Sequence, residues 1–89
     1  MSETREIRLK RLRIRCWRRG TKEMDLILGG FADCGKRGLS ALDTPDLDAF
    51  ERLIEENDQD LYIWISGQSP APSQHAPMVA KLRFFHEIR

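Results

Sequence analysis

Residues 8–31, RLKRLRIRCWRRGTKEMDLILGGF, decide the fold class, because two helix-like segments meet there at a glycine. In the first segment, Leu9, Leu12 and Cys16 recur at the i, i+3 and i+7 positions of one helical face. Ile14 and Cys16 also alternate with arginines, as they would in a strand. Arginine and lysine favour helices, however, and no hairpin turn with a matching second strand follows. We therefore interpret the first segment as a helix.

The glycine and threonine that follow predict a helix end and a new helix start. Gly20 suits a helix C-terminus, because glycine enters the left-handed region at little cost. Thr21 is expected to cap the second helix. Its core-facing stripe has the i, i+3, i+4, i+7 spacing and comprises Met24, Ile27, Leu28 and Phe31. Because Gly29 and Gly30 weaken the middle of this helix, we expect it to end near residues 31–32.

A third helix is predicted in the stretch LSALDTPDLDAFERLIEE, where Thr44 precedes Pro45. The proline ring suits the first helical position, and Asp46 and Asp48 lie near the positive end of the helix. The apolar face of this helix is expected to comprise Leu47, Phe50, Leu53 and Ile54.

A fourth helix is expected in NDQDLYIWISG, with Asn57 or Asp58 as its cap and Gly67 as its terminator. Its buried side is expected to comprise Leu61, Trp64 and Ile65. The polar stretch QSPAPSQ reads as a linker. A last helix opens at Ala76-Pro77 and is expected to bury some of Val79, Leu82, Phe84 and Phe85. The sequence therefore predicts an all-α fold, a small bundle of about five short helices.

The composition predicts one small globular domain. The 89 residues are 40% hydrophobic and 33% charged, which suits a single core rather than two. We expect residues 1–67 to form a helical core and residues 68–89 a linker and a helix that packs on it or extends from it. No apolar signal region follows Met1, and no apolar run is long enough for membrane insertion. We expect a bacterial cytoplasmic protein, with the mitochondrial matrix as the alternative.

Charge is segregated along the chain. Residues 1–22 hold nine Lys/Arg and two Glu, a net charge of +7, whereas residues 43–60 hold eight Asp/Glu and one Arg, a net charge of −7. The basic first helix supports one alternative function, a small nucleic-acid-binding or regulatory module. The acidic segment would repel the same polyanion, and a polar recognition helix is missing. We therefore expect no nucleic-acid partner.

Catalysis and metal binding find little support in the sequence. Cys16, Cys34, His75 and His86 match no familiar metal-ligand spacing, so we expect no metal and two reduced cysteines. The arginines beside Cys16 suggest a reactive thiol as a further alternative, but its place on the apolar stripe favours a structural role. No convergent set of acid, base and nucleophile appears, and we expect a protein that is not an enzyme.

Three aromatic residues divide between core and surface. Trp64 shares a helical face with Leu61 and Ile65, which predicts a core position. Trp17 and Tyr62 remain open between the core and a contact with a partner, because Trp, Tyr and Arg are enriched at binding hot spots.

Two segments, RRGTKEMDLILGGF and LSALDTPDLDAFERLIEENDQDLYIWISG, together resemble the succinate dehydrogenase assembly factor family. The most specific part of the resemblance is the Arg-Gly-x-x-Glu motif, which is Arg19, Gly20, Thr21, Lys22 and Glu23 in this chain. Asp-x-Asp-Leu-Tyr-x-Trp follows in the expected order. Thr21 departs from the pattern, since an apolar residue is common at its position in the family.

The resemblance implies a dedicated chaperone. Such proteins bind the flavoprotein subunit of succinate dehydrogenase and promote covalent attachment of FAD to a histidine of that subunit, a reaction regarded as autocatalytic. The flavoprotein subunit of fumarate reductase is a second candidate client. FAD belongs to the client, and no stably bound cofactor is expected on this chain. By the family's pattern, Arg19, Gly20 and Glu23 lie at the contact surface near the flavin.

Physical reasoning from the same residues agrees with this expectation. Gly20 lets a partner backbone approach closely, and Arg19 presents a planar fork suited to a carboxylate or carbonyls. Glu23 either holds that guanidinium or pairs across the interface. The predicted partner-binding set is completed by the steering arginines and two aromatics, Arg11, Arg15, Arg18, Trp17 and Tyr62.

Overall fold

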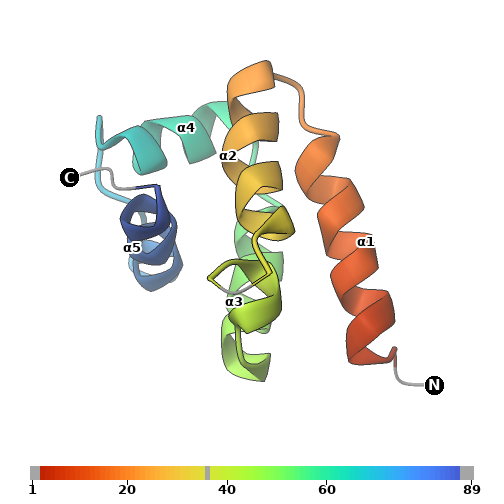
Figure 1. Ribbon diagram of the computed structural model, residues 1–89. Helices are drawn as coiled ribbons and strands as arrows, with labels where there is room; N and C mark the ends of the chain where they lie inside the picture. Colours follow the sequence, from red (N-terminus) through yellow and green to blue (C-terminus); the bar gives the residue numbers. More distant parts are fainter. Residues whose placement is uncertain (1–2, 36, 87–89) are drawn as a thin grey trace. The chain divides into compact units, whose positions relative to one another are not determined.

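Five α-helices and one short 3-10 helix make up the described part of the chain, residues 3–35 and 37–86 of a computed structural model (Figure 1). In chain order they are α1 (Arg5–Trp17), α2 (Lys22–Asp33), η1 (Leu39–Ala41), α3 (Thr44–Leu53), α4 (Asp58–Ser66) and α5 (Ala76–Phe85). No strand occurs among these residues, and the predicted all-α class with about five short helices is confirmed. The chain divides into two compact units, residues 1–41 and 42–89.

In the first unit, α1 and α2 lie side by side, and η1 contacts α2 (Figure 1). The Thr4 side chain caps α1 by accepting a hydrogen bond from the Ile7 N–H at 3.2 Å. The helix buries Leu12 and Cys16, both on the predicted stripe, so the helical interpretation of this arginine-rich segment is confirmed.

The predicted role of Gly20 at the end of α1 is wrong. The helix ends at Trp17, and its C-cap is Arg18, which has φ −116° and ψ 46°. Gly67 is the one glycine of the described residues with a positive φ. The Arg19 N–H donates to Oδ1 of Asp25 at 2.8 Å. A side-chain acceptor on the next helix thus provides the hydrogen-bond partner of a backbone N–H in this turn, and a left-handed glycine is not needed there.

The predicted start and stripe of α2 are confirmed. Thr21 Oγ1 accepts a hydrogen bond from the Met24 N–H at 3.2 Å, as an N-cap does. Met24, Leu28 and Phe31 are buried, and Ile27 is half-buried. The helix runs to Asp33, slightly beyond the end expected from its two glycines.

In the second unit, α5 contacts both α3 and α4. Asp43 caps α3, because its side chain accepts a hydrogen bond from the Asp46 N–H at 3.0 Å. The helix therefore starts at Thr44, and Pro45 lies one residue after the first helical position predicted for it. Asn57 caps α4, and Gly67 ends it with φ 87°, as predicted.

All three helices and the Ile54 cap of α3 contribute buried apolar side chains to this unit: Leu47, Phe50, Leu53, Ile54, Leu61, Ile65, Met78, Val79 and Leu82. Trp64, expected in the core, is half-buried, and Phe84 is 78% exposed. His75 is buried and satisfied, since its Nε2 lies 2.9 Å from Oε2 of Glu56. The division into residues 1–67 and 68–89 stays a prediction, and residues 1–2 and 87–89 at the outer ends of these ranges lie outside the described residues.

Candidate functional site

The turn between α1 and α2 presents the Arg-Gly-x-x-Glu motif on the surface. Arg19 is half-buried and its backbone is held by Asp25, whereas Gly20, Thr21 and Glu23 are exposed. Because the backbone of this turn is fixed at both ends, by Asp25 and by the Thr21 cap, the exposed glycine stands in a defined conformation. Such a turn offers bare backbone to an approaching surface.

Glu23 lies in the first turn of α2, where the positive end of the helix stabilises a carboxylate. Among the residues that the structure describes, its side chain makes no ion pair or hydrogen bond. Of the two roles considered for Glu23, holding the Arg19 guanidinium is therefore not realised within the chain. Pairing with a group outside the chain stays a prediction.

Trp17 lies at the end of α1, clamped against α2. Its indole Nε1 donates to Oδ2 of Asp33 at 3.1 Å, and the same carboxylate accepts from Nε of Arg13 at 3.2 Å. The ring covers Gly29, where an added Cβ would lie 2.3 Å from the Trp17 Cε2 atom. The indole is nonetheless 41% exposed. The clamp therefore presents a large aromatic ring to solvent in one orientation.

A shallow cleft of about 400 Å³ surrounds this ring, and Lys10, Arg13, Ile14, Trp17 and Arg18 line it. Ile14 is 54% exposed. Three cations thus frame two apolar side chains on one side of α1. This chemistry suits a protein surface that offers both carboxylates and apolar groups.

The remaining predicted residues differ in their surroundings. Arg18 is exposed and Arg15 is half-buried, both near the turn. Arg11 is paired with Glu3, since its Nε and Nη2 donate to the two carboxylate oxygens at 2.9 and 2.8 Å. Tyr62 is 41% exposed and belongs to α4 in the second unit. A partner-binding role for these residues stays a prediction.

The reactive-thiol hypothesis for Cys16 is wrong. The residue is fully buried, and this burial raises the pKa of its thiol to about 12, outweighing the opposite effect of Arg19 and Arg15. At neutral pH the side chain is a protonated thiol in the core, which is neither nucleophilic nor accessible.

Within residues 3–35 and 37–86, no three His, Cys, Asp or Glu side chains gather as metal ligands would. No helix in these ranges has the length and apolarity needed to cross a bilayer.

Sequence reasoning missed three residues that shape this site: Asp25, Gly29 and Asp33. Asp25 falls inside the recognised sequence segment, but no local pattern indicates that it accepts the Arg19 N–H. Gly29 reads as a weak point of a helix, whereas it makes room for the indole. Asp33 is 16 residues from Trp17, so only the packing of α1 on α2 reveals the contact.

The turn and its flanking helices fall within a recognised protein family. The model of the Sdh5 family, described as "Flavinator of succinate dehydrogenase", matches residues 10–86. The chain belongs to this family. Its members are assembly factors and not catalytic enzymes, as the sequence predicted. The resemblance carried by the Arg-Gly-x-x-Glu motif is therefore confirmed.

Similar proteins come from fungi and from bacteria. "Succinate dehydrogenase assembly factor 2, mitochondrial" of Mycosarcoma maydis is 40% identical over 75 residues, which are 84% of this chain and 30% of that protein. "FAD assembly factor SdhE" of Acetobacter pasteurianus is 33% identical over 76 residues, 84% of this chain and 67% of that one. The Schizosaccharomyces pombe assembly factor 2 is 35% identical over 72 residues, 81% and 50% of the two chains.

These relatives have two consequences for the sequence-based expectations. The chain spans 30% and 50% of the length of the two mitochondrial relatives and 67% of the length of the bacterial one. Family members thus occur both in bacteria and in mitochondria, and the expected bacterial cytoplasmic location stays a prediction.

Proposed function

We propose that this chain is an assembly factor that binds the flavoprotein subunit of succinate dehydrogenase and promotes covalent attachment of FAD to that subunit. The observation that carries the proposal is the family match over residues 10–86, which includes the motif at the exposed turn between α1 and α2. FAD stays with the client, and the chain contributes binding rather than chemistry. The flavoprotein subunit of fumarate reductase is a second candidate client.

The surface around the turn suits this task. Gly20 gives a partner backbone close access, while Arg19 and Glu23 offer charges of both signs within one turn of it. Beside them, the clamped Trp17 ring supplies an apolar anchor. Because the turn, cap and ring are ordered before contact, binding loses less conformational entropy than a mobile loop would. In this proposal the ordered surface holds the client in a conformation in which its own histidine attacks the flavin.

The cations that line the cleft around Trp17 suit a protein client better than a nucleic acid. Nucleic-acid binding requires several cations free to contact phosphates. In the first unit, Arg11 is paired with Glu3, and Arg13 with Asp33. Of the other exposed cations of this unit, Lys10 and Arg18 border the apolar side chains of the cleft. We therefore infer a protein partner.

The proposal is tested with the apo flavoprotein subunit, produced in a host deleted for its own assembly factor. The purified subunit is incubated with FAD, with and without this chain, and then denatured and resolved on a gel. We expect in-gel flavin fluorescence, which reports covalent flavin, to rise several-fold with the chain. Equal fluorescence in both samples would overturn the proposal.

A Gly20→Arg variant tests whether the turn between α1 and α2 contacts the client. The new side chain is expected to obstruct the close approach and remove the stimulation. Gly20 is exposed, so circular dichroism should show unchanged helix content. If Gly20→Arg stimulates flavinylation as well as the unsubstituted chain, the contact does not involve this turn.

A further inference from the structure

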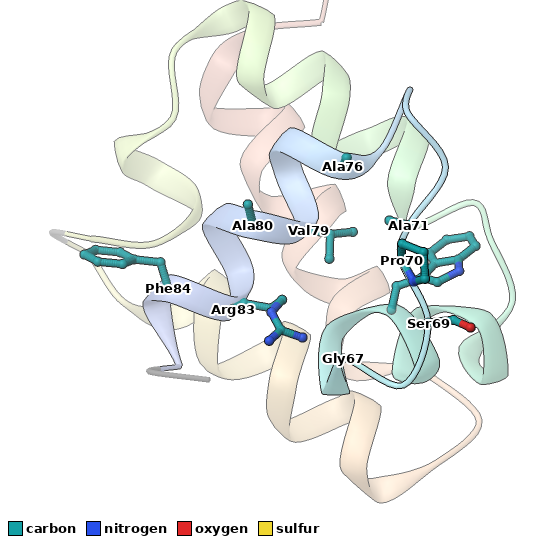
Figure 2. Close-up of a pocket in the computed structure, with 10 residues that line it drawn as sticks. Gly67, Ser69, Pro70, Ala71, Ala76, Val79, Ala80, Arg83 and Phe84 are labelled. Atoms are coloured by element: carbon teal, nitrogen blue, oxygen red, sulfur yellow. The ribbon is translucent and has the colours of Figure 1, made fainter. Parts of the chain in front are cut away.

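A larger cleft lies in the second unit, where the end of α4, the segment after it and α5 meet (Figure 2). Its volume is about 620 Å³. The walls are mainly apolar and come from Trp64, Pro70, Ala71, Val79 and Phe84. Phe84 is 78% exposed and stands at the edge of the cleft. The flavinylation proposal, which concerns the first unit, makes no use of this cleft.

Among the residues that the structure describes, Arg83 is the one charged residue that lines the cleft. Its Nη1 donates to the carbonyl oxygen of Ile65 at 3.1 Å, near the end of α4. Gly67 makes room for the guanidinium, because an added Cβ there would lie 2.5 Å from that Nη1 atom. Figure 2 shows the guanidinium extending from α5 toward Gly67. The cation is therefore fixed beside the apolar walls.

The guanidinium retains hydrogen-bonding capacity. Arginine carries five N–H donors, and the bond to Ile65 uses one of them. Within residues 3–35 and 37–86, no carboxylate pairs with Arg83, and none lines the cleft. A half-buried cation in apolar surroundings favours a ligand that carries a negative charge.

The net charge of the second unit limits how much negative charge that ligand can carry. Residues 42–89 hold four Lys/Arg and nine Asp/Glu, a net charge of −5. Such a unit repels an acidic run or a polyanion at long range. A single carboxylate flanked by apolar side chains meets Arg83 and the walls together with the least repulsion.

We propose that this cleft binds a segment of a partner protein in which one Asp or Glu side chain stands between apolar residues. The carboxylate pairs with Arg83, and the apolar neighbours cover the walls between Trp64 and Phe84. The partner is the flavoprotein subunit, so this step rests on the proposed function. It gives the client a second contact, on a unit separate from the one that carries the motif.

The test places a photoreactive p-benzoylphenylalanine at position 84 of the full chain, and in a second preparation at position 17. Each is irradiated with the purified flavoprotein subunit, and the crosslinked peptides are identified by mass spectrometry. We expect position 84 to crosslink to a segment of the subunit that carries Asp or Glu among apolar residues. Position 17 reports on the proposed function separately.

The outcomes distinguish the two ideas. Crosslinking from position 17 without any from position 84 would overturn the cleft proposal and leave the function standing. A product between two copies of this chain, or a crosslink to a segment without a carboxylate, would also overturn it. If neither position captures the subunit, both proposals fail.

Affinity measurements with variants test the role of the charge. Arg83→Gln is expected to weaken binding of the subunit about ten-fold, because a charge-assisted contact is lost. Ala80→Gln is expected to weaken it similarly by filling the cleft, and it leaves the bond to Ile65 intact. Lys81→Gln is the matched control on the same helix, outside the cleft, and should bind normally. Unchanged affinity for both cleft variants would exclude a carboxylate contact at Arg83.

Discussion

Trp17 is the residue in which exposure and rigidity coincide. Exposed tryptophans at interfaces contribute most when the ring does not have to be ordered on binding. Asp33 fixes the indole by its N–H, and Gly29 allows the ring to lie against α2. Asp33 also accepts a hydrogen bond from Arg13, so one carboxylate positions an aromatic and a cation together. These contacts favour Trp17 as a partner anchor over the core position that its sequence left open.

We predict that Trp17→Ala weakens binding of the flavoprotein subunit about thirty-fold, the loss expected for a hot-spot residue of about 2 kcal/mol. The loss should appear mainly as faster dissociation in a surface plasmon resonance experiment. Leu26→Ala is the control, since Leu26 is 55% exposed on α2 and is not among the residues that line the cleft around Trp17. Equal effects of the two truncations would argue against a specific anchor.

How far these residues were predictable depends on the range of the contact. The motif residues Arg19, Gly20 and Glu23 are recognisable from their order alone, and Cys16 from its helical spacing. The support of Trp17 is not recognisable, because Asp33 becomes its neighbour only when α1 packs on α2. A prediction from sequence thus identifies the members of the site but not the contacts that orient them.

At the scale of helices, local signals predict the elements well. Thr21, Asn57 and Gly67 act as caps and terminator, as predicted, because each contact spans only a few residues. Two predictions fail for a related reason. Asp25 accepts the hydrogen bond at the turn where Gly20 was expected to end α1, and the Asp43 cap starts α3 one residue before the position predicted from Pro45. In both places an aspartate provides an acceptor that competes with the expected residue.

Gly29 shows how an element is adapted to its neighbour, and a double-mutant cycle tests this. Alanine normally stabilises a helix interior by about 0.5–1 kcal/mol relative to glycine. With Trp17 in place, however, the added Cβ meets the indole, and we predict that Gly29→Ala lowers the free energy of unfolding by about 1 kcal/mol. In a Trp17→Ala background the same substitution should be stabilising.

Urea denaturation of the four proteins, followed by circular dichroism, measures this coupling. The decisive result is the change of sign between the two backgrounds. If Gly29→Ala has the same effect with and without the indole, the close approach of ring and helix is not what requires glycine at this position.

At the scale of the whole molecule, each of the two units has its own charge and its own cleft. Residues 1–41 hold eleven Lys/Arg and five Asp/Glu, a net charge of +6, whereas residues 42–89 carry −5. The net charge of the chain is only +1, so the total does not reveal the opposite charges of the two units. The segregation of charge between the two units can be predicted from the sequence, but the pairing of Arg11 and Arg13 with carboxylates cannot. Exposed cations that border the Trp17 cleft are therefore the ones expected to act on a partner.

We predict that these cations determine the rate of association with the flavoprotein subunit. A Lys10→Glu/Arg18→Glu variant reverses two exposed charges at the cleft and should lower the association rate constant about ten-fold at low salt. Its dissociation rate should change little, and the fall of the association rate with rising salt should flatten. Stopped-flow fluorescence at several salt concentrations measures both.

The matched control is Arg52→Glu/Lys81→Glu, which reverses two exposed charges in the second unit and gives the chain the same net charge. Because long-range attraction acts through local potential as well as through net charge, the control should slow association far less. Equal slowing of the two variants would show that only total charge matters. Slower association confined to Lys10→Glu/Arg18→Glu would establish the cationic frame of the Trp17 cleft as the surface that the client meets first.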